Sequence, residues 1–298
     1  MKDGILIVNK PAGMTSFDVV AKIRKLYGTR QVGHTGTLDP MAEGVLVLLV
    51  GRSVKASEYA VCHDKSYRAG LRLGITTDTE DTTGKILTRS DKLPSEAEVS
   101  ASVKSFAGEI TQVPPMYSAL KVGGEKLCDL ARQGKTVERE ARPITIYEIS
   151  CETADEASGD YILSVKCSKG TYIRTLCADI GAKLGCGGAM SSLIRTETGG
   201  FTLSDSHTLA ELEALAPEER EALLLPTESI FSSLPAVWLP EFFARLALSG
   251  NEIYLSKIGQ SFPLGARVRL YDGTFFALGE VREFENGAAI KPIKQFRV

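Results

Sequence analysis

The segment from Gly33 to Val50 constrains this chain more than any other. It reads Gly-His-Thr-Gly-Thr-Leu-Asp-Pro-Met-Ala-Glu-Gly and then continues into six aliphatic residues, Val45 to Val50. The aliphatic run predicts a buried strand. The glycines permit φ > 0 or a close approach of backbone to a ligand, and Pro40 keeps Asp39 out of the helical region. The sequence therefore predicts a constrained loop that presents the Asp39 carboxylate, with an ordinary Asp-Pro turn as the alternative.

Length and composition are those of an ordinary globular protein. The 298 residues, 43% hydrophobic and 24% charged, suffice for a sizeable core and for more than one domain. The longest aliphatic run is far shorter than the ~20 residues that a membrane helix needs. Residues 1–10 lack the basic and apolar pattern of an export signal. We therefore expect a cytoplasmic protein, and by default a monomer.

Cysteine and histidine spacing gives no sign of a metal centre. No Cys-x-x-Cys pair occurs, and His34, His63 and His207 are scattered. We expect reduced thiols, no metal and no cofactor. The cysteines concerned are Cys62, Cys128, Cys151, Cys167, Cys177 and Cys186.

The formal net charge of -2 conceals an uneven distribution. Residues 1–201 carry 26 basic and 24 acidic side chains, residues 202–249 carry 2 and 8, and residues 250–298 carry 7 and 5. An acidic segment on one side of the molecule would leave room for a basic face elsewhere, of the kind that binds nucleic acid. A solvated helical surface at 211–223 explains the acidic cluster equally well.

Strand patterns predict an α+β fold. Strands are expected at Ile5–Val8, Tyr67–Leu73, Ile144–Ile149 and Tyr161–Cys167. Because helices interrupt them irregularly, a mixed, mainly antiparallel sheet with flanking helices is favoured over a regular βαβ series.

Three expected helices carry recognisable ends. The first has Ser16 as its N-cap and stops at Gly28. The second opens with a capping box formed by Ser95 and Glu98. The third runs from Glu125 to Gln133.

The last fifty residues predict a small β-barrel module. A boundary is expected near 234–240, where two prolines flank Trp238. Beyond Gly250, short strands are separated by the hairpin signals Asp272-Gly273 and Asn286-Gly287. The net charge of this module predicts RNA contact through four basic side chains, Arg267, Arg269, Lys291 and Lys294.

The loop around Asp39 resembles the catalytic motif of the TruB-type tRNA pseudouridine synthases, which isomerise uridine 55 in the T-loop of tRNA. Further segments resemble the same family in the same order, from about residue 4 to about residue 201. The resemblance implies a bacterial stand-alone enzyme with a catalytic domain at 1–236 and a PUA-like RNA-binding domain at 237–298. The further segments are Val8–Ser16, Lys65–Arg68, Pro115–Lys121, Arg142–Ile144 and Cys167–Leu176.

The reaction of that family breaks the C1′–N1 bond of a uridine, turns the uracil and rejoins it through C5, with no redox change and no cofactor. It needs a carboxylate at the sugar–base junction, a surface for the detached base and exclusion of water. The resemblance assigns the carboxylate to Asp39. Whether it attacks the ribose, attacks the base or removes a sugar proton stays open. The implied partner is tRNA, through its T-arm, with no membrane and no obligatory protein partner.

Three side chains are implied to receive a flipped uracil. By the resemblance, Tyr67 would stack on the base, Tyr172 would contact base or ribose, and Leu193 would line the same pocket. On the residues alone, a strand tyrosine such as Tyr67 is more often half-buried packing.

Arg174 stands in an unfavourable place for a cation. The Gly170-Thr171 turn predicts the start of a helix, and the helix dipole disfavours positive charge in the first turn. Arg174 is therefore expected to have an anionic partner, which the resemblance identifies as Asp39. A surface arginine that reaches solvent is the alternative.

His34 and Lys10 carry weaker signals. The resemblance places His34 against the RNA beside the flipped nucleotide, and a loop histidine bonded to backbone is the alternative. Lys10 would support the active-site loop or contact phosphate, whereas an exposed, solvated lysine explains it as well. Glu43 receives no role, and the stretch around Arg195 is less basic than in some relatives, which leaves an RNA contact there open.

Two other functions compete with an enzyme. A non-catalytic RNA-binding or RNA-folding protein would keep the scaffold, but it has no use for an unpaired carboxylate next to RNA phosphates. A relative that works under RNA guidance in a ribonucleoprotein would carry basic extensions. Such extensions are not found in this sequence, which favours the stand-alone form.

Overall fold

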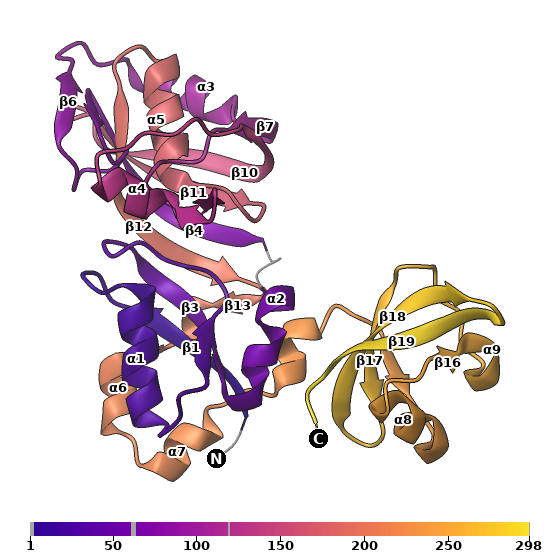
Figure 1. Cartoon of the computed structure of the whole chain (residues 1–298). Helices are drawn as coiled ribbons and strands as arrows, with labels where there is room; N and C mark the ends of the chain where they lie inside the picture. Colours follow the sequence, from indigo (N-terminus) through magenta and orange to yellow (C-terminus); the bar gives the residue numbers. More distant parts are fainter. Residues whose placement is uncertain (1–2, 61–63, 119, 298) are drawn as a thin grey trace.

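The computed structural model describes residues 3–60, 64–118 and 120–297. Among these residues, a ten-stranded sheet forms the framework and a five-stranded sheet carries the C-terminal part of the chain (Figure 1). The order of the main sheet is β14-β1-β3-β12-β4-β11-β10-β7, with β13 on β12 and β2 on β3. Only the pairs β1–β14 and β3–β12 are parallel among its described pairings. The predicted α+β fold with a mainly antiparallel sheet is therefore confirmed.

The strands of the main sheet agree with the predicted ones and extend beyond them, and β12, which no pattern indicated, occupies its middle. Their bounds are β1 Gly4–Lys10, β2 Val32–His34, β3 Glu43–Val50, β4 Lys65–Leu73, β7 Gly108–Gln112, β10 Arg142–Asp155, β11 Asp160–Cys167, β12 Gly188–Thr198, β13 Phe201–Thr202 and β14 His207–Thr208. Two small hairpins complete this part: β5 Ile75–Thr77 with β6 Ile86–Arg89, and β8 Lys121–Val122 with β9 Glu125–Lys126.

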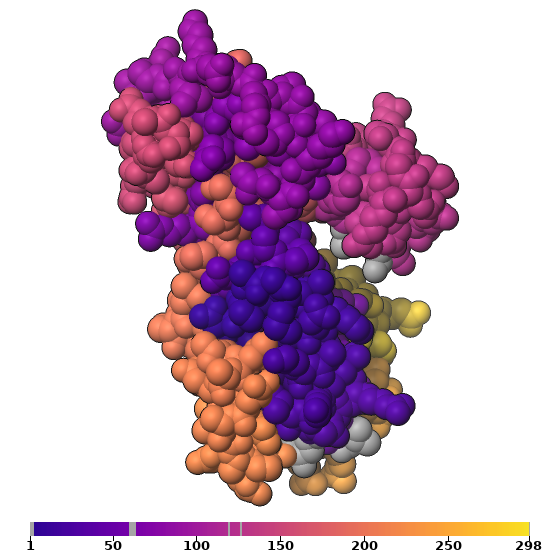
Figure 2. All heavy atoms as spheres, turned by 90° about the vertical axis from the view of Figure 1, so that its left-hand side faces the viewer, coloured from indigo at the N-terminus to yellow at the C-terminus, as the bar shows by residue number. Residues whose placement is uncertain are grey.

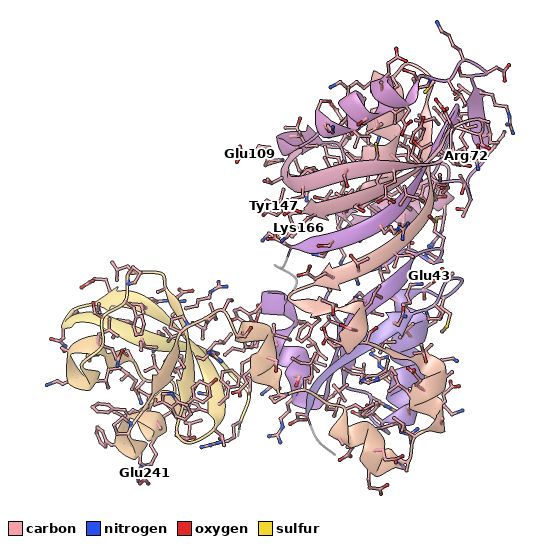
Figure 3. All side chains as sticks on the ribbon, turned by 180° about the vertical axis from the view of Figure 1, so that it is seen from behind. Glu43, Arg72, Glu109, Tyr147, Lys166 and Glu241 are labelled. Atoms are coloured by element: carbon pink, nitrogen blue, oxygen red, sulfur yellow. The ribbon has the colours of Figure 1, made fainter. Side chains whose placement is uncertain are left out.

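Four residues of the predicted site region lie in one row across the middle of this sheet. Lys10 on β1 pairs with Gly44 on β3, Gly44 pairs with Arg195 on β12, and Arg195 pairs with Tyr67 on β4. The parallel contact between β3 and β12 covers two residue pairs only, and Glu43 marks this junction in Figure 3. The row brings together segments that are far apart in the sequence.

Gly44 makes that junction possible. Its φ is +101°, and a Cβ placed there would lie 2.3 Å from the carbonyl oxygen of Arg195. No side chain can occupy this position without moving β12 away from β3.

The helices cover the two ends of the sheet separately. Helices α3 and α5 pack on β10, β12 and β4, whereas α1 and α6 pack near β1 and β2 (Figure 1). Their bounds are α1 Ser16–Leu26, α2 Ser57–Ala60, α3 Glu96–Lys104, α4 Leu127–Arg132, α5 Ile173–Lys183, α6 Leu209–Ala214, α7 Pro217–Ala222, α8 Glu241–Leu248 and α9 Leu255–Ile258, with 3-10 turns at Gly51–Ala56, Leu203–Asp205 and Thr227–Phe231.

Two helix predictions need correction. The N-cap of α1 is Thr15 and not Ser16. The Thr15 side chain accepts a hydrogen bond from the Asp18 backbone N–H, and the Asp18 carboxylate accepts one from the Thr15 backbone N–H. The helix expected from Glu125 starts only at Leu127, because Glu125 and Lys126 pair with the preceding strand. The segment between β7 and β10 that contains this helix projects from the body, in magenta in Figure 2. The capping box of Ser95 with Glu98 is confirmed.

The C-terminal sheet has the order β15-β17-β18-β19-β16. Both predicted hairpins are present, with Asp272-Gly273 and Asn286-Gly287 at their turns. Its strands are β15 Ala236–Trp238, β16 Ile253–Tyr254, β17 Arg267–Tyr271, β18 Phe275–Phe284 and β19 Gly287–Gln295.

One buried cluster joins the two sheets. Leu278 and Phe296 of the C-terminal part pack with Ile5, Ile7 and Val47 of the main sheet. A cut through the chain before Gly250 would expose this cluster, so the C-terminal part contributes to the stability of the rest.

Several compositional expectations can be compared with the structure. The acidic cluster at 211–223 lies on α6 and α7, where four glutamates are exposed and Glu221 is half-buried, so the solvated-surface interpretation fits most of the cluster. The cysteines of the described residues form no disulfide, whereas Cys62 and His63 lie outside them. No helix in the described part of the chain is long and apolar enough to span a membrane.

Candidate active site

Backbone contacts hold the loop that carries Asp39 on both sides of that residue. The Ser16 hydroxyl accepts from the Leu38 N–H at 2.9 Å and donates to the Leu38 carbonyl at 3.2 Å. On the other side, the Pro40 carbonyl accepts from the Gly13 N–H at 2.8 Å. The backbone on both sides of Asp39 is thereby fixed, so its side chain projects from a constrained loop.

Lys10 is a buried support of the same loop. Its ammonium donates to the carbonyls of Pro11 at 2.8 Å, Met14 at 2.6 Å and Pro40 at 3.3 Å, and the residue has no exposed surface. Burial lowers the pKa of Lys10 to about 8, against the attraction of the Glu43 and Asp39 carboxylates. The alternative prediction of an exposed, solvated lysine at position 10 is therefore wrong. Of the two roles expected for Lys10, support of the loop is the one that these contacts serve.

Arg195 holds the beginning of the loop from β12. Its guanidinium donates to the carbonyls of Val45 at 2.7 Å, Gly36 at 3.1 Å and Thr37 at 3.5 Å, and only 1% of the residue is exposed. The sequence leaves an RNA contact around Arg195 open. In the structure, the Arg195 side chain is buried and bonds to backbone carbonyls of the protein itself.

Arg174 forms the expected ion pair with Asp39. Its Nε lies 2.9 Å from Asp39 Oδ2, and its Nη2 lies 3.3 Å from Oδ1, so the contact has two points. Arg174 Nη2 also donates to the Tyr117 carbonyl at 2.8 Å, and its Nη1 donates to the Thr79 carbonyl at 3.3 Å. Arg174 lies in the first turn of α5 and is 6% exposed as a side chain, whereas the Asp39 side chain keeps 33% of its surface accessible.

The balance of charges at Asp39 sets its ionisation. Burial raises the pKa of the Asp39 carboxyl, the Arg174 guanidinium opposes that rise, and the Asp81 carboxylate adds to it. The pair with Arg174 therefore favours the charged form of a partly desolvated carboxylate, and the accessible part of that carboxylate can meet a ligand.

Tyr67 lies next to Arg195 in the sheet and is 8% exposed. Burial raises the pKa of Tyr67 to about 12, with the Arg195 charge opposing. The phenol is therefore neutral at pH 7. Its pattern alone suggested half-buried packing, and it does belong to the main core.

Tyr172 and Leu193 reach this region from two other elements. Tyr172 is the half-buried N-cap residue of α5, two positions before Arg174, and burial raises its pKa. Leu193 precedes Arg195 by two residues on β12 and therefore lies on the same face of that strand. It is 7% exposed.

His34 ends β2, opposite Leu48 of β3. Burial and the nearby Arg195 charge lower its pKa, so the imidazole is neutral at pH 7. Its buried Nδ1 has no hydrogen-bond partner among the described residues. The alternative from the sequence was a loop histidine whose ring bonds to backbone. At Nδ1, the described residues form no such bond.

Sequence reasoning missed the residues that hold these groups in place. The sequence predicts Ser16 as a helix cap, but Thr15 takes that role and the Ser16 hydroxyl binds the Asp39 loop at Leu38. Glu80, whose φ is +63°, accepts from the Thr175 hydroxyl at 2.6 Å in the first turn of α5. No pattern in the sequence indicated this contact, because it depends on how the loop between β5 and β6 folds back.

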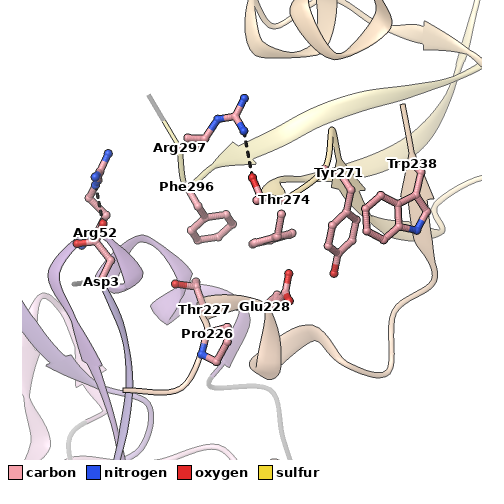
Figure 4. A pocket seen from close by; sticks show the side chains of 12 residues that line it. Asp3, Arg52, Pro226, Thr227, Glu228, Trp238, Tyr271, Thr274, Phe296 and Arg297 are labelled. Atoms are coloured by element: carbon pink, nitrogen blue, oxygen red, sulfur yellow. Dashed lines mark hydrogen bonds and ion pairs between the residues drawn. The ribbon is translucent and has the colours of Figure 1, made fainter. Parts of the chain in front are cut away.

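A hollow of about 490 Å³ lies elsewhere, at the junction with the C-terminal sheet (Figure 4). Its aromatic wall includes Trp238 stacked on Tyr271 at 4.5 Å. The two arginines that line it are already paired, Arg52 with Asp3 and Arg297 with Asp272. None of the predicted site residues lines it.

Residues 24–173 match the family model described as TruB family pseudouridylate synthase (N terminal domain). The chain belongs to the TruB family of pseudouridylate synthases. Residues 174–232 match the tRNA pseudouridylate synthase B C-terminal domain. The loop of Asp39, Tyr67 and Tyr172 fall in the first of these matches, and Arg174 and Leu193 fall in the second.

Full-length relatives agree with this membership. The chain is 44% identical to tRNA pseudouridine synthase B of Alkaliphilus oremlandii over 98% of both chains. It is 43% identical to the protein of the same name from Clostridium kluyveri, over 95% of this chain and 97% of that one. Among solved structures, one titled as a Cbf5-Nop10-Gar1 complex has a TM-score of 0.76 at 26% identity, covering 98% of this chain and 84% of that one.

A metal would have few ligands here. Among the described residues, no group of three or more His, Cys, Asp or Glu side chains could hold a metal ion. As a pseudouridylate synthase the protein is an isomerase.

Proposed function

We propose that this protein converts uridine 55 in the T-loop of tRNA into pseudouridine. The observation that carries the proposal is the two-point pair of Asp39 with Arg174, at 2.9 and 3.3 Å, with a carboxylate that remains partly accessible. The names of the relatives at 43–44% identity supply the class of substrate, since they are tRNA pseudouridine synthases.

Asp39 is proposed as the catalytic carboxylate. Isomerisation detaches the uracil from C1′ and rejoins it through C5, so the atoms of the substrate balance without a redox partner. A carboxylate kept ionised in a partly dry site can attack the ribose, attack the base or remove a sugar proton. Arg174 keeps the charge and the orientation that each of these three steps needs.

The uracil must leave its stack before it can react, because the glycosidic bond of a stacked base is inaccessible. We propose that Tyr67, Tyr172 and Leu193 receive the flipped nucleotide. His34, neutral and at the end of β2, braces the RNA beside it. Lys10 takes part as a support of the loop.

The C-terminal part is proposed as a PUA-like RNA-binding domain at 237–298, beside a catalytic domain at 1–236. Its predicted RNA-contacting cations are engaged within the protein: Lys291 with Glu252, Lys294 with Glu58, and Arg267 with Glu280. Surface pairs of this kind contribute little, about 1 kcal/mol or less, and phosphates can replace the carboxylates. Arg269 bonds to the Leu234 carbonyl and the Tyr271 hydroxyl.

We further propose a monomeric, cytoplasmic enzyme that acts without an obligatory protein partner and without a cofactor. Identity of 43–44% along nearly the whole chain to proteins named tRNA pseudouridine synthase B supports this. The solved relative at 26% identity is, by its title, part of a Cbf5-Nop10-Gar1 complex and is the more distant of these relatives.

The test is incubation of the purified protein with unmodified tRNA, followed by mapping of pseudouridine at single-nucleotide resolution. The proposal expects modification of uridine 55 in the tRNA and in an isolated T-arm hairpin. It expects none in a plain duplex, in free uridine or with the Asp39→Asn variant. Efficient conversion of a uridine within a fully paired duplex, or modification only at another position, would refute the proposed substrate.

A further inference from the structure

The helix that carries Arg174 has no cap of its own. Its N-cap residue is Tyr172, which makes no side-chain capping bond, although N-caps are usually Ser, Thr, Asp or Asn. Without a cap, the first backbone N–H groups of a helix need partners from elsewhere. The orientation of this helix end matters because both Tyr172 and Arg174 project from it.

Gln112, at the end of β7, binds the backbone of this N-cap residue. Its Oε1 accepts from the Tyr172 N–H at 2.8 Å, and its Nε2 donates to the Tyr172 carbonyl at 3.0 Å. Because an amide has one accepting and one donating end, the opposite orientation would break both bonds. The side chain therefore pairs with Tyr172 as a neighbouring strand would.

Gln112 has the burial of a structural residue and stands next to the site. It is 3% exposed, although it belongs to an edge strand of the main sheet. The chain that continues from it reaches Tyr117, whose carbonyl accepts from Arg174 Nη2 at 2.8 Å. One continuous segment thus holds the backbone of Tyr172 and the guanidinium of Arg174.

We propose that Gln112 is a positioning residue of the isomerisation, which aligns Arg174 with Asp39 by holding both backbone groups of Tyr172. The inference rests on the proposed function, because its effect is measured in that reaction. Gln112 acts through Tyr172 and touches neither substrate nor Asp39.

The experiment compares the full-length Gln112→Met, Gln112→Glu and wild-type proteins on the same tRNA. Gln112→Met keeps the length of the side chain and removes both bonds, so kcat is expected to fall about 10- to 100-fold while the Kd for tRNA stays within about twofold. The acid limb of kcat/KM is expected to move to higher pH, because a misaligned Arg174 stabilises the Asp39 carboxylate less. Gln112→Glu keeps the acceptor for the Tyr172 N–H and should recover part of kcat.

Gln133→Met is the matched control, since Gln133 is exposed just after α4 and lies outside the proposed site and the proposed RNA-binding domain. A purely structural role would lower the folded fraction and leave kcat per folded molecule and the acid limb unchanged, and that result would overturn the proposal.

Hydrogen exchange of the peptide 168–176 provides a readout independent of activity. Faster exchange in Gln112→Met supports the proposal, whereas unchanged exchange refutes it. Absence of pseudouridine with the wild-type protein would instead refute the proposed function.

Discussion

Arg174 Nε lies 2.9 Å from Asp39 Oδ2, although 135 residues separate the two in the sequence. The arginine occupies the first turn of α5, where the helix dipole alone would disfavour it. Asp39 and Glu80, which bonds to the next residue of the helix, supply the negative charge that offsets this placement.

Replacing Asp39 with Asn should abolish isomerisation. The change keeps the shape of the side chain and removes its charge, so the rate should fall roughly 10³-fold or more while tRNA binding and folding persist. Single-turnover rates and binding by filter retention would measure the two quantities. The control is Asp91→Asn, at an exposed position. A near wild-type rate for Asp39→Asn would remove this carboxylate from the mechanism.

Replacing Arg174 should shift the pH dependence of the reaction. Burial raises the pKa of Asp39 and Arg174 opposes that rise, so weakening the arginine raises this pKa further. The acid limb of kcat/KM should therefore lie at the lowest pH for wild type, at a higher pH for Arg174→Lys and at the highest pH for Arg174→Gln. Lysine keeps the positive charge but lacks the planar guanidinium that makes two bonds to the carboxylate. Arg89→Lys, at an exposed position, serves as the control. Coincident acid limbs for all four proteins would contradict this assignment.

Replacing Asp179 with Asn should stabilise the protein near neutral pH. Burial, and to a lesser degree the Glu80 carboxylate, raise the pKa of Asp179 to about 6. A carboxyl whose folded-state pKa is raised favours folding below its unfolded pKa, and this advantage is lost as pH rises through 6. The melting temperature of Asp179→Asn should exceed that of wild type at pH 7.5, and the gap should shrink on acidification to pH 4.5. A gap independent of pH would count against the raised pKa.

Replacing Gly44 with Ala should disrupt the junction of β3 with β12. A Cβ there would lie 2.3 Å from the Arg195 carbonyl oxygen, whereas a Cβ at Gly134 would meet nothing within 4 Å, although both glycines have positive φ. Gly134→Ala should cost about 1 kcal/mol from backbone strain, and Gly44→Ala should cost about 3 kcal/mol or more. Urea denaturation of both variants measures the difference, and equal losses would show that the backbone contact is not limiting.

Local patterns in the sequence were sufficient to predict most helices and strands and part of the candidate site. Val45 to Val50 forms the buried strand β3, and both C-terminal hairpins turn at their Asp-Gly and Asn-Gly pairs. The need of Arg174 for an anionic partner also followed from its place in a helix. These features depend on neighbours in the chain, so periodicity, capping and turn chemistry reveal them. The roles of Tyr67, Tyr172, Leu193 and His34 toward RNA, and the domain limits at 236 and 237, stay predictions.

The tertiary structure alone decided what surrounds the Asp39 loop. Lys10 ends a strand and precedes a proline, and nothing local distinguishes it from a solvated lysine. Only the order of β1, β3, β12 and β4 places Lys10, Gly44, Arg195 and Tyr67 in one row. The same order buries two cations against loop carbonyls. A single sequence carries the chemistry of each side chain, but strand order and register determine which distant groups satisfy it, because those pairings depend on the packing of the whole sheet.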